Sequence, residues 1–306
     1  MKKNFGPLFV ISAAILWGVD GVVLRPFLYD LPVNIVVLIE SALVASLLTP
    51  FIFSRFNELK TMHKKDWLAF AGVAVFGGAI GTLAITKALF YVNFVNLSIV
   101  ILIQKLQPVF AIIFAWIILK ERPAGKFYGW AALAVISAYF MTFGLSFPDF
   151  TIKNETFLAA VFALIAAGGF AMSTVLSKRA LKNTTFFTAT YLRFLMSTVI
   201  LLVISSFMFN FNEIGSITVT HLIVFGIIAF STGGAAIFLY YFGLKKISAS
   251  SSTIYELSFP LSAVLLEYFL RGNILTPFQW LAVAILFFSI FKVNSINTSK
   301  KRFISD

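Results

Sequence analysis

Ionisable side chains interrupt several of the most apolar stretches of the sequence. They are Asp20, Glu40, Lys87, Lys105, Arg193, Glu256 and Glu267. A charge at the centre of a membrane helix costs roughly 2.5–3.5 kcal/mol on insertion scales. Such groups therefore pair with one another, face water or lose their charge. Four acids against three bases predict pairing, together with one acid that binds a proton.

Position along each apolar stretch indicates which of these charges pair. Glu40 and Lys105 are displaced from the middle of their stretches in one direction by about 3–5 Å, given the helical rise per residue. Arg193 and Glu256 are displaced by similar amounts in the other direction. We expect two ion pairs between helices, Glu40 with Lys105 and Arg193 with Glu256. These pairs either lock the fold or rearrange and contact a substrate.

Asp20 stands apart, because its only nearby partner in the sequence pattern is Lys87. An unpaired acid on a helix that lines a cavity is a candidate proton or substrate-cation site. The alternative is that Asp20 lies at a helix end and reaches the membrane–water interface on the outer side of the bilayer. Lys87 and Glu267 are expected at such interfaces, where Lys87 extends its ammonium toward water.

Two amides and a proline lie together in one apolar stretch. Gln104 and Gln107 are three residues apart, so they share one helix face, and Pro108 follows directly. Proline frees a carbonyl one turn earlier and permits a helix bend. Amides beside a bend suit a hydrogen-bonding ligand site, or else they hydrogen-bond between helices. The counterparts in the second half of the chain are Tyr255, Glu256 and Pro260.

Aromatic and small polar side chains complete the candidate binding residues. Trp17, together with Tyr240 or Tyr241, is expected in the walls of a cavity, although with 37 phenylalanines an aromatic residue at any one site is weak evidence. Ser173 is expected there as the counterpart of Asp20. The chain has no cysteine, and its two histidines lie in or beside predicted loops. We therefore expect no metal site, no cofactor and no catalytic residue.

The elements that must position these residues follow from composition. Of 306 residues, 60% are hydrophobic and 12% are charged, about half the charged fraction of an average soluble domain. Too few polar residues remain to cover a water-soluble globule. The apolar stretches are long enough for membrane helices, whose backbone must satisfy its own hydrogen bonds in lipid. They cover residues 5–25, 33–54, 67–91, 95–119, 127–146, 157–178, 186–209, 219–244, 249–270 and 277–297. The sequence thus predicts an all-α integral membrane protein with ten transmembrane helices.

Lysine and arginine are distributed unevenly over the predicted loops. Of the 24 in the chain, 18 lie on the side of the N-terminus and three on the opposite side. Positive residues gather on the cytoplasmic side of membrane proteins, so both termini are predicted to be cytoplasmic in a multi-pass protein of the cell (cytoplasmic) membrane. The formal net charge of +12 then reflects topology and contact with anionic lipid headgroups rather than binding of nucleic acid.

The two halves of the chain resemble each other. A shift of 152–153 residues aligns Trp17 with Phe170, Arg25 with Lys178, Glu40 with Arg193, Gln104 with Glu256 and Pro108 with Pro260. Each half holds five predicted helices, an odd number, so the second half enters the membrane from the opposite side. Such inverted repeats are typical of secondary transporters. The predicted units are residues 5–147 and 157–297, followed by a basic cytoplasmic tail at 298–306.

Short motifs occur in a recognisable order along these helices. They are Leu16-Trp17-Gly18, Ala88-Leu89, Pro108-Val109-Phe110, Leu119-Lys120-Glu121-Arg122 and Gly243-Leu244. The ordered set resembles the EamA family of the drug/metabolite transporter superfamily, over roughly residues 8–144 and 157–293. The resemblance implies a ten-helix bundle of two inverted five-helix repeats around a central cavity. It also implies that helices 1, 3, 4, 6, 8 and 9 line that cavity.

These observations together predict a secondary transporter of a small polar or amphipathic metabolite. The two halves are expected to rock about a midplane site by alternating access. Many members of the resembled family export their substrates, so export is the expected direction, and proton coupling through Asp20 or Glu256 is a hypothesis. The alternative is a lipid-handling intramembrane enzyme or scaffold. The expected partners are a small-molecule substrate, the bilayer and protons, and the sequence indicates no particular oligomeric state.

Overall fold

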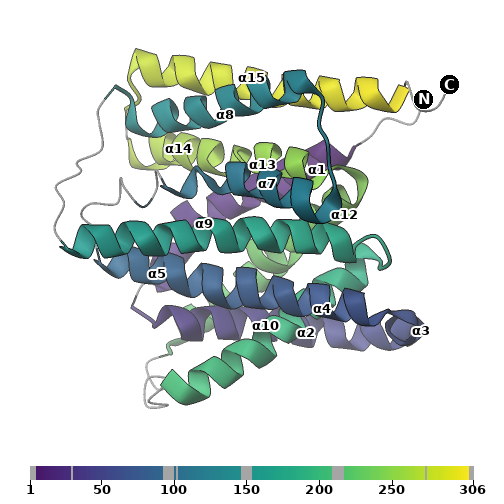
Figure 1. The fold of residues 1–306 in the computed structure, drawn as a ribbon. Helices are drawn as coiled ribbons and strands as arrows, with labels where there is room; N and C mark the ends of the chain where they lie inside the picture. Colours follow the sequence, from purple (N-terminus) through teal and green to yellow (C-terminus); the bar gives the residue numbers. More distant parts are fainter. Residues whose placement is uncertain are drawn as a thin grey trace.

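The computed structural model describes residues 5–28, 30–91, 100, 103–145, 154–208, 217–272 and 274–302. Within these segments every regular element is a helix, and the long helices run roughly side by side (Figure 1). The first and last described helical residues, Gly6 and Arg302, and the turns around residues 62, 122 and 183 lie at one end of the bundle, on the right in Figure 1. We call this end, which carries most of the predicted cytoplasmic lysines and arginines, the basic end.

The first half of the chain begins with a helix that changes its geometry partway. α1 (Gly6–Val19) continues into the π-helical η1 (Asp20–Leu24) and the 3-10 turn η2 (Arg25–Leu28). The remaining elements are α2 (Val33–Ile52), η3 (Phe53–Arg55), α3 (Phe56–Thr61), α4 (Lys64–Val73), the π-helical η4 (Ala74–Gly81), α5 (Thr82–Tyr91), α7 (Gln107–Leu119) and α8 (Gly125–Phe143).

The second half repeats this plan. Its elements are α9 (Asn154–Ala180), α10 (Phe186–Met208), α11 (Val219–Ile228), the π-helical η6 (Ala229–Gly233), α12 (Gly234–Lys246), α13 (Ala249–Tyr255), α14 (Ser258–Arg271) and α15 (Pro277–Arg302).

Eight of the described helical segments are long and apolar enough to cross a membrane. They are Gly6–Leu28, Asn34–Thr61, Lys64–Ile85, Phe157–Ala180, Phe186–Ser206, Val219–Lys246, Ala249–Leu270 and Pro277–Ile296. Each overlaps one predicted apolar stretch. The fourth stretch is represented by the shorter α7, since residues 92–99, 101 and 102 lie outside the described residues. The fifth corresponds to α8, which is not among these eight segments, so the count of ten spans stays a prediction.

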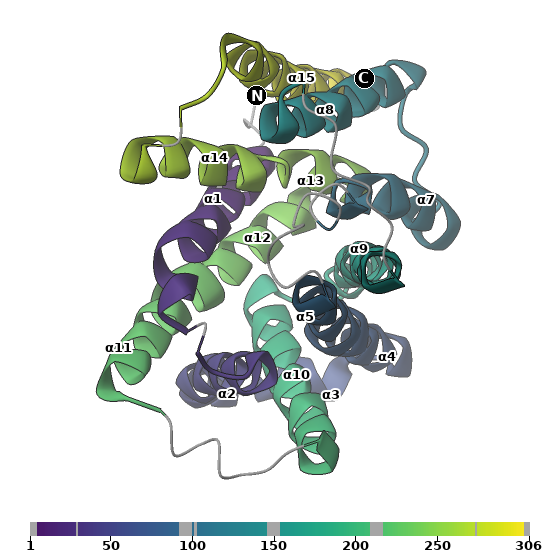
Figure 2. The same cartoon turned by 90° about the vertical axis from the view of Figure 1, so that its left-hand side faces the viewer.

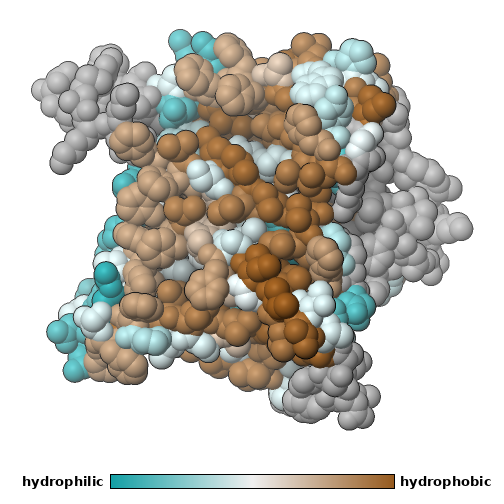
Figure 3. All heavy atoms as spheres, turned by 180° about the vertical axis from the view of Figure 1, so that it is seen from behind, coloured by the Kyte–Doolittle hydropathy of each residue, from teal (hydrophilic) through white to brown (hydrophobic). Residues whose placement is uncertain are grey.

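The surface of the bundle is that of a membrane protein. Large apolar side chains such as Phe230, Phe269 and Phe291 are 60–73% exposed. Figure 3 shows a broad hydrophobic face, with hydrophilic residues mainly toward the two ends of the helices. Burial of these side chains in lipid takes the place of burial in a protein core.

Two irregularities recur at equivalent places in the halves. η4 and η6 interrupt the third and the eighth predicted helix at positions related by the 152–153-residue shift. The backbone also makes tight turns at 105–106 and 256–257, in the fourth and ninth helices. A new helix starts directly after each turn, with Pro108 or Pro260 in its first turn, where the missing proline N–H leaves no hydrogen bond unmade.

Close helix packing connects the two halves. α1 contacts α12 and α14, and α9 contacts α4, α5 and α7. At Gly243 a Cβ atom would lie 2.6 Å from the carbonyl oxygen of Gly6, so only glycine permits this approach of α12 to α1. Figure 2 shows α8 and α15 paired at one edge of the bundle, away from α2 and α10 at the opposite edge.

Candidate functional site

A cavity of about 310 Å³ lies where the irregular helices meet. Its walls come from α1, α7 with the turn before it, α9, α10, α12, and α13 with α14. The lining residues are Trp17, Gln104, Lys105, Gln107, Pro108, Phe170, Ser173, Thr174, Arg193, Ile237, Tyr240, Thr253, Glu256, Leu257, Phe259 and Pro260. Among the described residues the predicted third helix contributes no lining side chain, whereas the seventh contributes Arg193.

The cavity gathers most of the side chains that the sequence indicated. Those that line it are Trp17, Gln104, Lys105, Gln107, Pro108, Ser173, Arg193, Tyr240, Glu256 and Pro260. Tyr255 does not line it, and its side chain instead packs within the hydrophobic core between the helices. Asp20 and Glu40 belong to a separate polar cluster, described below.

Glu256 is the centre of the hydrogen bonding in this cavity. Its Oε1 accepts hydrogen bonds from the Tyr240 hydroxyl at 2.7 Å and from Ser252 Oγ at 3.1 Å. Its Oε2 accepts one from Gln107 Nε2 at 3.3 Å. The Tyr240 hydroxyl also lies 3.1 Å from Thr174 Oγ1. The contact with Gln107 joins the first half of the chain to the second, at the two turns that interrupt their helices.

Arg193 lines the same cavity but does not pair directly with Glu256. Its Nη1 donates to the Tyr241 hydroxyl at 3.3 Å, and that hydroxyl is 2.9 Å from Ser177 Oγ. No ion pair within 4.0 Å joins Arg193 to Glu256 among the described residues. The predicted direct pair is therefore corrected to two charges on one cavity wall, with Glu256 held by uncharged donors.

Lys105 does not pair with Glu40, contrary to the prediction from depth. Lys105 lines the cavity and is 8% exposed, whereas Glu40 binds Arg25. Depth along a helix fixes the height of a side chain but not the direction in which it points. Gln104, next to Lys105, donates from Nε2 to the carbonyl oxygen of Ala163 at 3.0 Å, which is a contact between helices.

Aromatic rings form the apolar part of the wall. The rings of Trp17 and Tyr240 lie 5.3 Å apart with an angle of 53° between their planes. Phe170, which the sequence did not single out for binding, lines the cavity as well. The repeat shift that aligns it with Trp17 could have identified it. Other lining residues without a sequence prediction are Thr174, Ile237, Thr253, Leu257 and Phe259, and their common residue types gave no signal.

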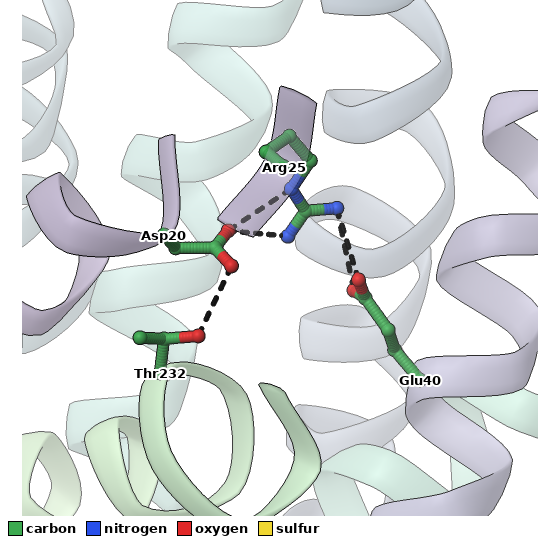
Figure 4. Close-up of polar contacts among 4 residues, drawn as sticks. All are labelled: Asp20, Arg25, Glu40 and Thr232. Atoms are coloured by element: carbon green, nitrogen blue, oxygen red, sulfur yellow. Dashed lines mark hydrogen bonds and ion pairs between the residues drawn. The ribbon is translucent and has the colours of Figure 1, made fainter. Parts of the chain in front are cut away.

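A second polar cluster lies beyond Trp17, toward the end of the bundle opposite the basic end. Arg25 binds Asp20 through Nη2 at 2.6 Å and Nε at 2.9 Å. Its Nη1 lies 3.1 Å from Glu40 Oε1. Thr232 Oγ1 donates to Asp20 Oδ1 at 3.0 Å. Figure 4 shows the four side chains converging from η1, η2, α2 and η6.

The expectation that Asp20 lacks a partner is therefore wrong. The reason is the π-helical geometry of η1, in which the backbone N–H of Arg25 bonds to the carbonyl oxygen of Asp20. This i to i+5 pattern places residues five apart on one side of the helix. A regular helix with 3.6 residues per turn separates those two side chains, so the sequence pattern gave no hint of the pair.

The basic end of the bundle is joined across the halves by a different carboxylate. Glu121 accepts hydrogen bonds from the backbone N–H groups of Ala249 and Ser250, at 2.8 and 3.0 Å, and from Ser250 Oγ at 2.7 Å. Nearby, Lys178 Nζ donates to the carbonyl oxygen of Leu244 at 2.7 Å. Polar contacts thus connect the halves both at this end and beyond the cavity.

Comparison with known proteins places this architecture in a family. The sequence matches the EamA-like transporter family over residues 4–143 and 157–295. It is 42% identical to the riboflavin transporter ImpX of Fusobacterium nucleatum subsp. nucleatum, over 95% of this chain and 98% of that protein. It is 26% identical to the uncharacterized transporter YwfM of Bacillus subtilis, over 98% and 97% of the two chains.

A solved crystal structure shares the fold, with a TM-score of 0.73 at 14% identity over 98% of this chain and 99% of the other. The named relatives are transporters, which favours a carrier over the alternative of a lipid-handling enzyme. This chain belongs to the EamA-like transporter family and is a membrane transporter of a small metabolite.

Proposed function

We propose that this protein transports riboflavin through the central cavity. The observation that carries the proposal is the 42% identity, over nearly the whole of both chains, to a relative named as a riboflavin transporter. The chemistry of the cavity supports it. Riboflavin combines a flat tricyclic ring with a flexible polyhydroxyl chain, so its site needs both aromatic and hydrogen-bonding walls.

The cavity supplies both kinds of wall. Trp17, Tyr240 and Phe170 offer ring faces and edges for stacking. Gln107 and Glu256 offer donors and acceptors for hydroxyl groups. Its volume of about 310 Å³ is at the lower end of the ~300–1,000 Å³ typical of small-molecule sites.

Transport is proposed to follow alternating access between two inverted repeats, residues 5–147 and 157–297, of five helices each. Two matching irregularities support the relationship between the halves. The π-helical segment η4 of the first half has its counterpart in η6, and the turn at 105–106 has its counterpart at 256–257. The side of the N-terminus carries 18 lysines and arginines and the opposite side carries three. This distribution supports a protein of the cell membrane whose two termini, including the basic tail at 298–306, are cytoplasmic.

We propose export as the direction of transport and proton coupling through a carboxylate of the cavity. Asp20 is held by Arg25, so Glu256 is the better candidate to carry a proton. It faces the cavity together with Lys105, Arg193 and Tyr240, so a proton or a ligand that reaches it changes the charge balance of the site directly.

The experiment is counterflow of labelled riboflavin into proteoliposomes that contain unlabelled riboflavin. We expect accumulation above that of protein-free vesicles, and competition by unlabelled flavin but not by ribitol alone. Repeating the assay with an imposed pH gradient of either sign tests both the direction and the coupling. Transport of another metabolite under conditions in which riboflavin does not move would contradict the proposal.

A further inference from the structure

Lys105 differs from every other charged group that lines the cavity. Its side chain is only 8% exposed, and among the described residues its Nζ has neither a hydrogen bond nor an ion pair. A buried charge that lacks a partner is costly to the fold. Groups of this kind persist where a ligand supplies the missing partner.

The other two charged groups of the cavity already have hydrogen-bond partners in the protein. Glu256 accepts hydrogen bonds from Tyr240, Ser252 and Gln107. Arg193 donates to the Tyr241 hydroxyl. The carboxylate is thus occupied by donors from α7, α12 and α13 and is not within ion-pair distance of Lys105. Two cations against one anion leave the lining with a surplus positive charge, and among the described residues Lys105 is the cation whose donors make no hydrogen bond or ion pair.

An ammonium group has three donors and no acceptor, which restricts the part of a ligand it can bind. Hydroxyl groups act as both donors and acceptors, so they match amides and carboxylates such as Gln107 and Glu256. Carbonyl oxygens only accept. The pyrimidinedione edge of a flavin ring concentrates carbonyl oxygens and carries negative potential, and it is the part of riboflavin that an isolated ammonium group recognises best.

We propose that Lys105 is the residue that binds the carbonyl edge of the flavin ring and selects substrates carrying it. This assignment rests on the proposed riboflavin transport. It predicts that recognition by Lys105 is independent of the polyhydroxyl chain. Lumiflavin, which keeps the ring and replaces that chain with a methyl group, is therefore bound with the same dependence on Lys105 as riboflavin.

The test compares both flavins on purified full-length protein by fluorescence titration. In Lys105→Met, the affinities for riboflavin and lumiflavin are expected to fall by the same factor of roughly ten or more, where tenfold corresponds to about 1.4 kcal/mol. Lys105→Gln should show a similar loss, and Lys105→Arg should retain part of the affinity. Lys87→Met is the matched control, since Lys87 is exposed and its ammonium lies 5.6 Å from the centre of the Phe162 ring, away from the lining.

Thermal unfolding without ligand separates binding from a structural role. Removal of an unpartnered buried charge is expected to leave the melting temperature unchanged or to raise it, while the affinity falls. A lower melting temperature of Lys105→Met with unchanged affinity for both flavins would overturn the assignment. So would a loss confined to riboflavin, because Lys105 would then act on the polyhydroxyl chain. Binding of riboflavin but not lumiflavin by the unaltered protein would also overturn it, because the flavin ring alone would then not be recognised. Failure of the unaltered protein to bind either flavin would instead overturn the proposed function, and the assignment with it.

Discussion

Thr232 donates a 3.0 Å hydrogen bond to Asp20 across 212 positions of the chain. The first residue lies in η6 and the second in η1, so the bond joins two π-helical segments from opposite halves. Arg25 extends the connection from Asp20 to Glu40 on α2. Beyond the cavity, three predicted membrane helices are thus held together by one cluster of four side chains (Figure 4).

Replacement of Asp20 by asparagine is predicted to loosen this cluster. The variant loses the charge that holds Arg25, and hydrogen bonds to charged groups contribute about 1.5–3 kcal/mol each. We expect a lower melting temperature and slower riboflavin counterflow. Thr232→Val removes a single hydrogen bond and serves as the graded comparison, with a smaller decrease in both. Wild-type stability and flux in Asp20→Asn would show that the cluster has no role in closing the bundle.

A double-mutant cycle distinguishes the partners of Glu40. Glu40→Gln and Arg25→Gln are expected to show a coupling energy of about 0.5–3 kcal/mol, since they remove the same ion pair. The effects of Glu40→Gln and Lys105→Gln on the free energy of unfolding should be additive, because these two residues are not in contact. Coupling in the second cycle but not in the first would support the pairing expected from depth.

Glu256→Gln is predicted to remove any dependence of transport on pH that arises in the cavity. The amide cannot exchange a proton, although it can still accept from Tyr240. Tyr240→Phe removes that donor and leaves the carboxylate in place, so pH dependence should persist with a flux that is lower by roughly tenfold or less, as expected for loss of one hydrogen bond. The measurement is riboflavin flux across a range of pH from about 5.5 to about 8. If Glu256 carries no proton, Glu256→Gln and the unaltered protein will show the same dependence of flux on pH.

The aromatic wall gives a graded prediction. Trp17→Ala should weaken riboflavin binding by about tenfold, because an aromatic contact contributes about 0.5–1.5 kcal/mol beyond its buried area. Trp17→Phe should keep most of the affinity. Fluorescence titration measures the affinity of each variant for riboflavin. Equal affinities of Trp17→Ala and Trp17→Phe would mean that the flavin ring does not contact this wall.

Gly243 tests the packing of α12 against α1. Gly243→Ala is expected to destabilise the protein by about 1–3 kcal/mol, since the added methyl group would be forced against the backbone of the first turn of α1. Gly129 in α8 has no atom within 4 Å of an added Cβ, so Gly129→Ala should be neutral or stabilising by up to about 1 kcal/mol. Equal melting temperatures for the two variants would contradict the close approach.

Much of the cavity could be predicted from the sequence, because polar and aromatic residues such as Gln107, Tyr240 and Glu256 are conspicuous in apolar helices. Their positions relative to one another could not. Depth alone assigned Lys105 to Glu40, and only the rotation of each helix shows that Lys105 points into the cavity while Glu40 points to Arg25. Periodicity assumes regular helices, so the pair of Asp20 with Arg25 across a π-helical turn escaped it.

The π-helical turns have a consequence for the history of the chain. A wide turn accommodates one more residue than the regular helix around it, so a residue can be gained or lost there while the flanking turns keep their hydrogen bonds. Single-residue insertions and deletions among related proteins should therefore concentrate within 20–24, 74–81 and 229–233. In a lineage that lost the extra residue at 20–24, Arg25 would rotate away from Asp20. The Asp20 carboxylate would then need a new neighbour.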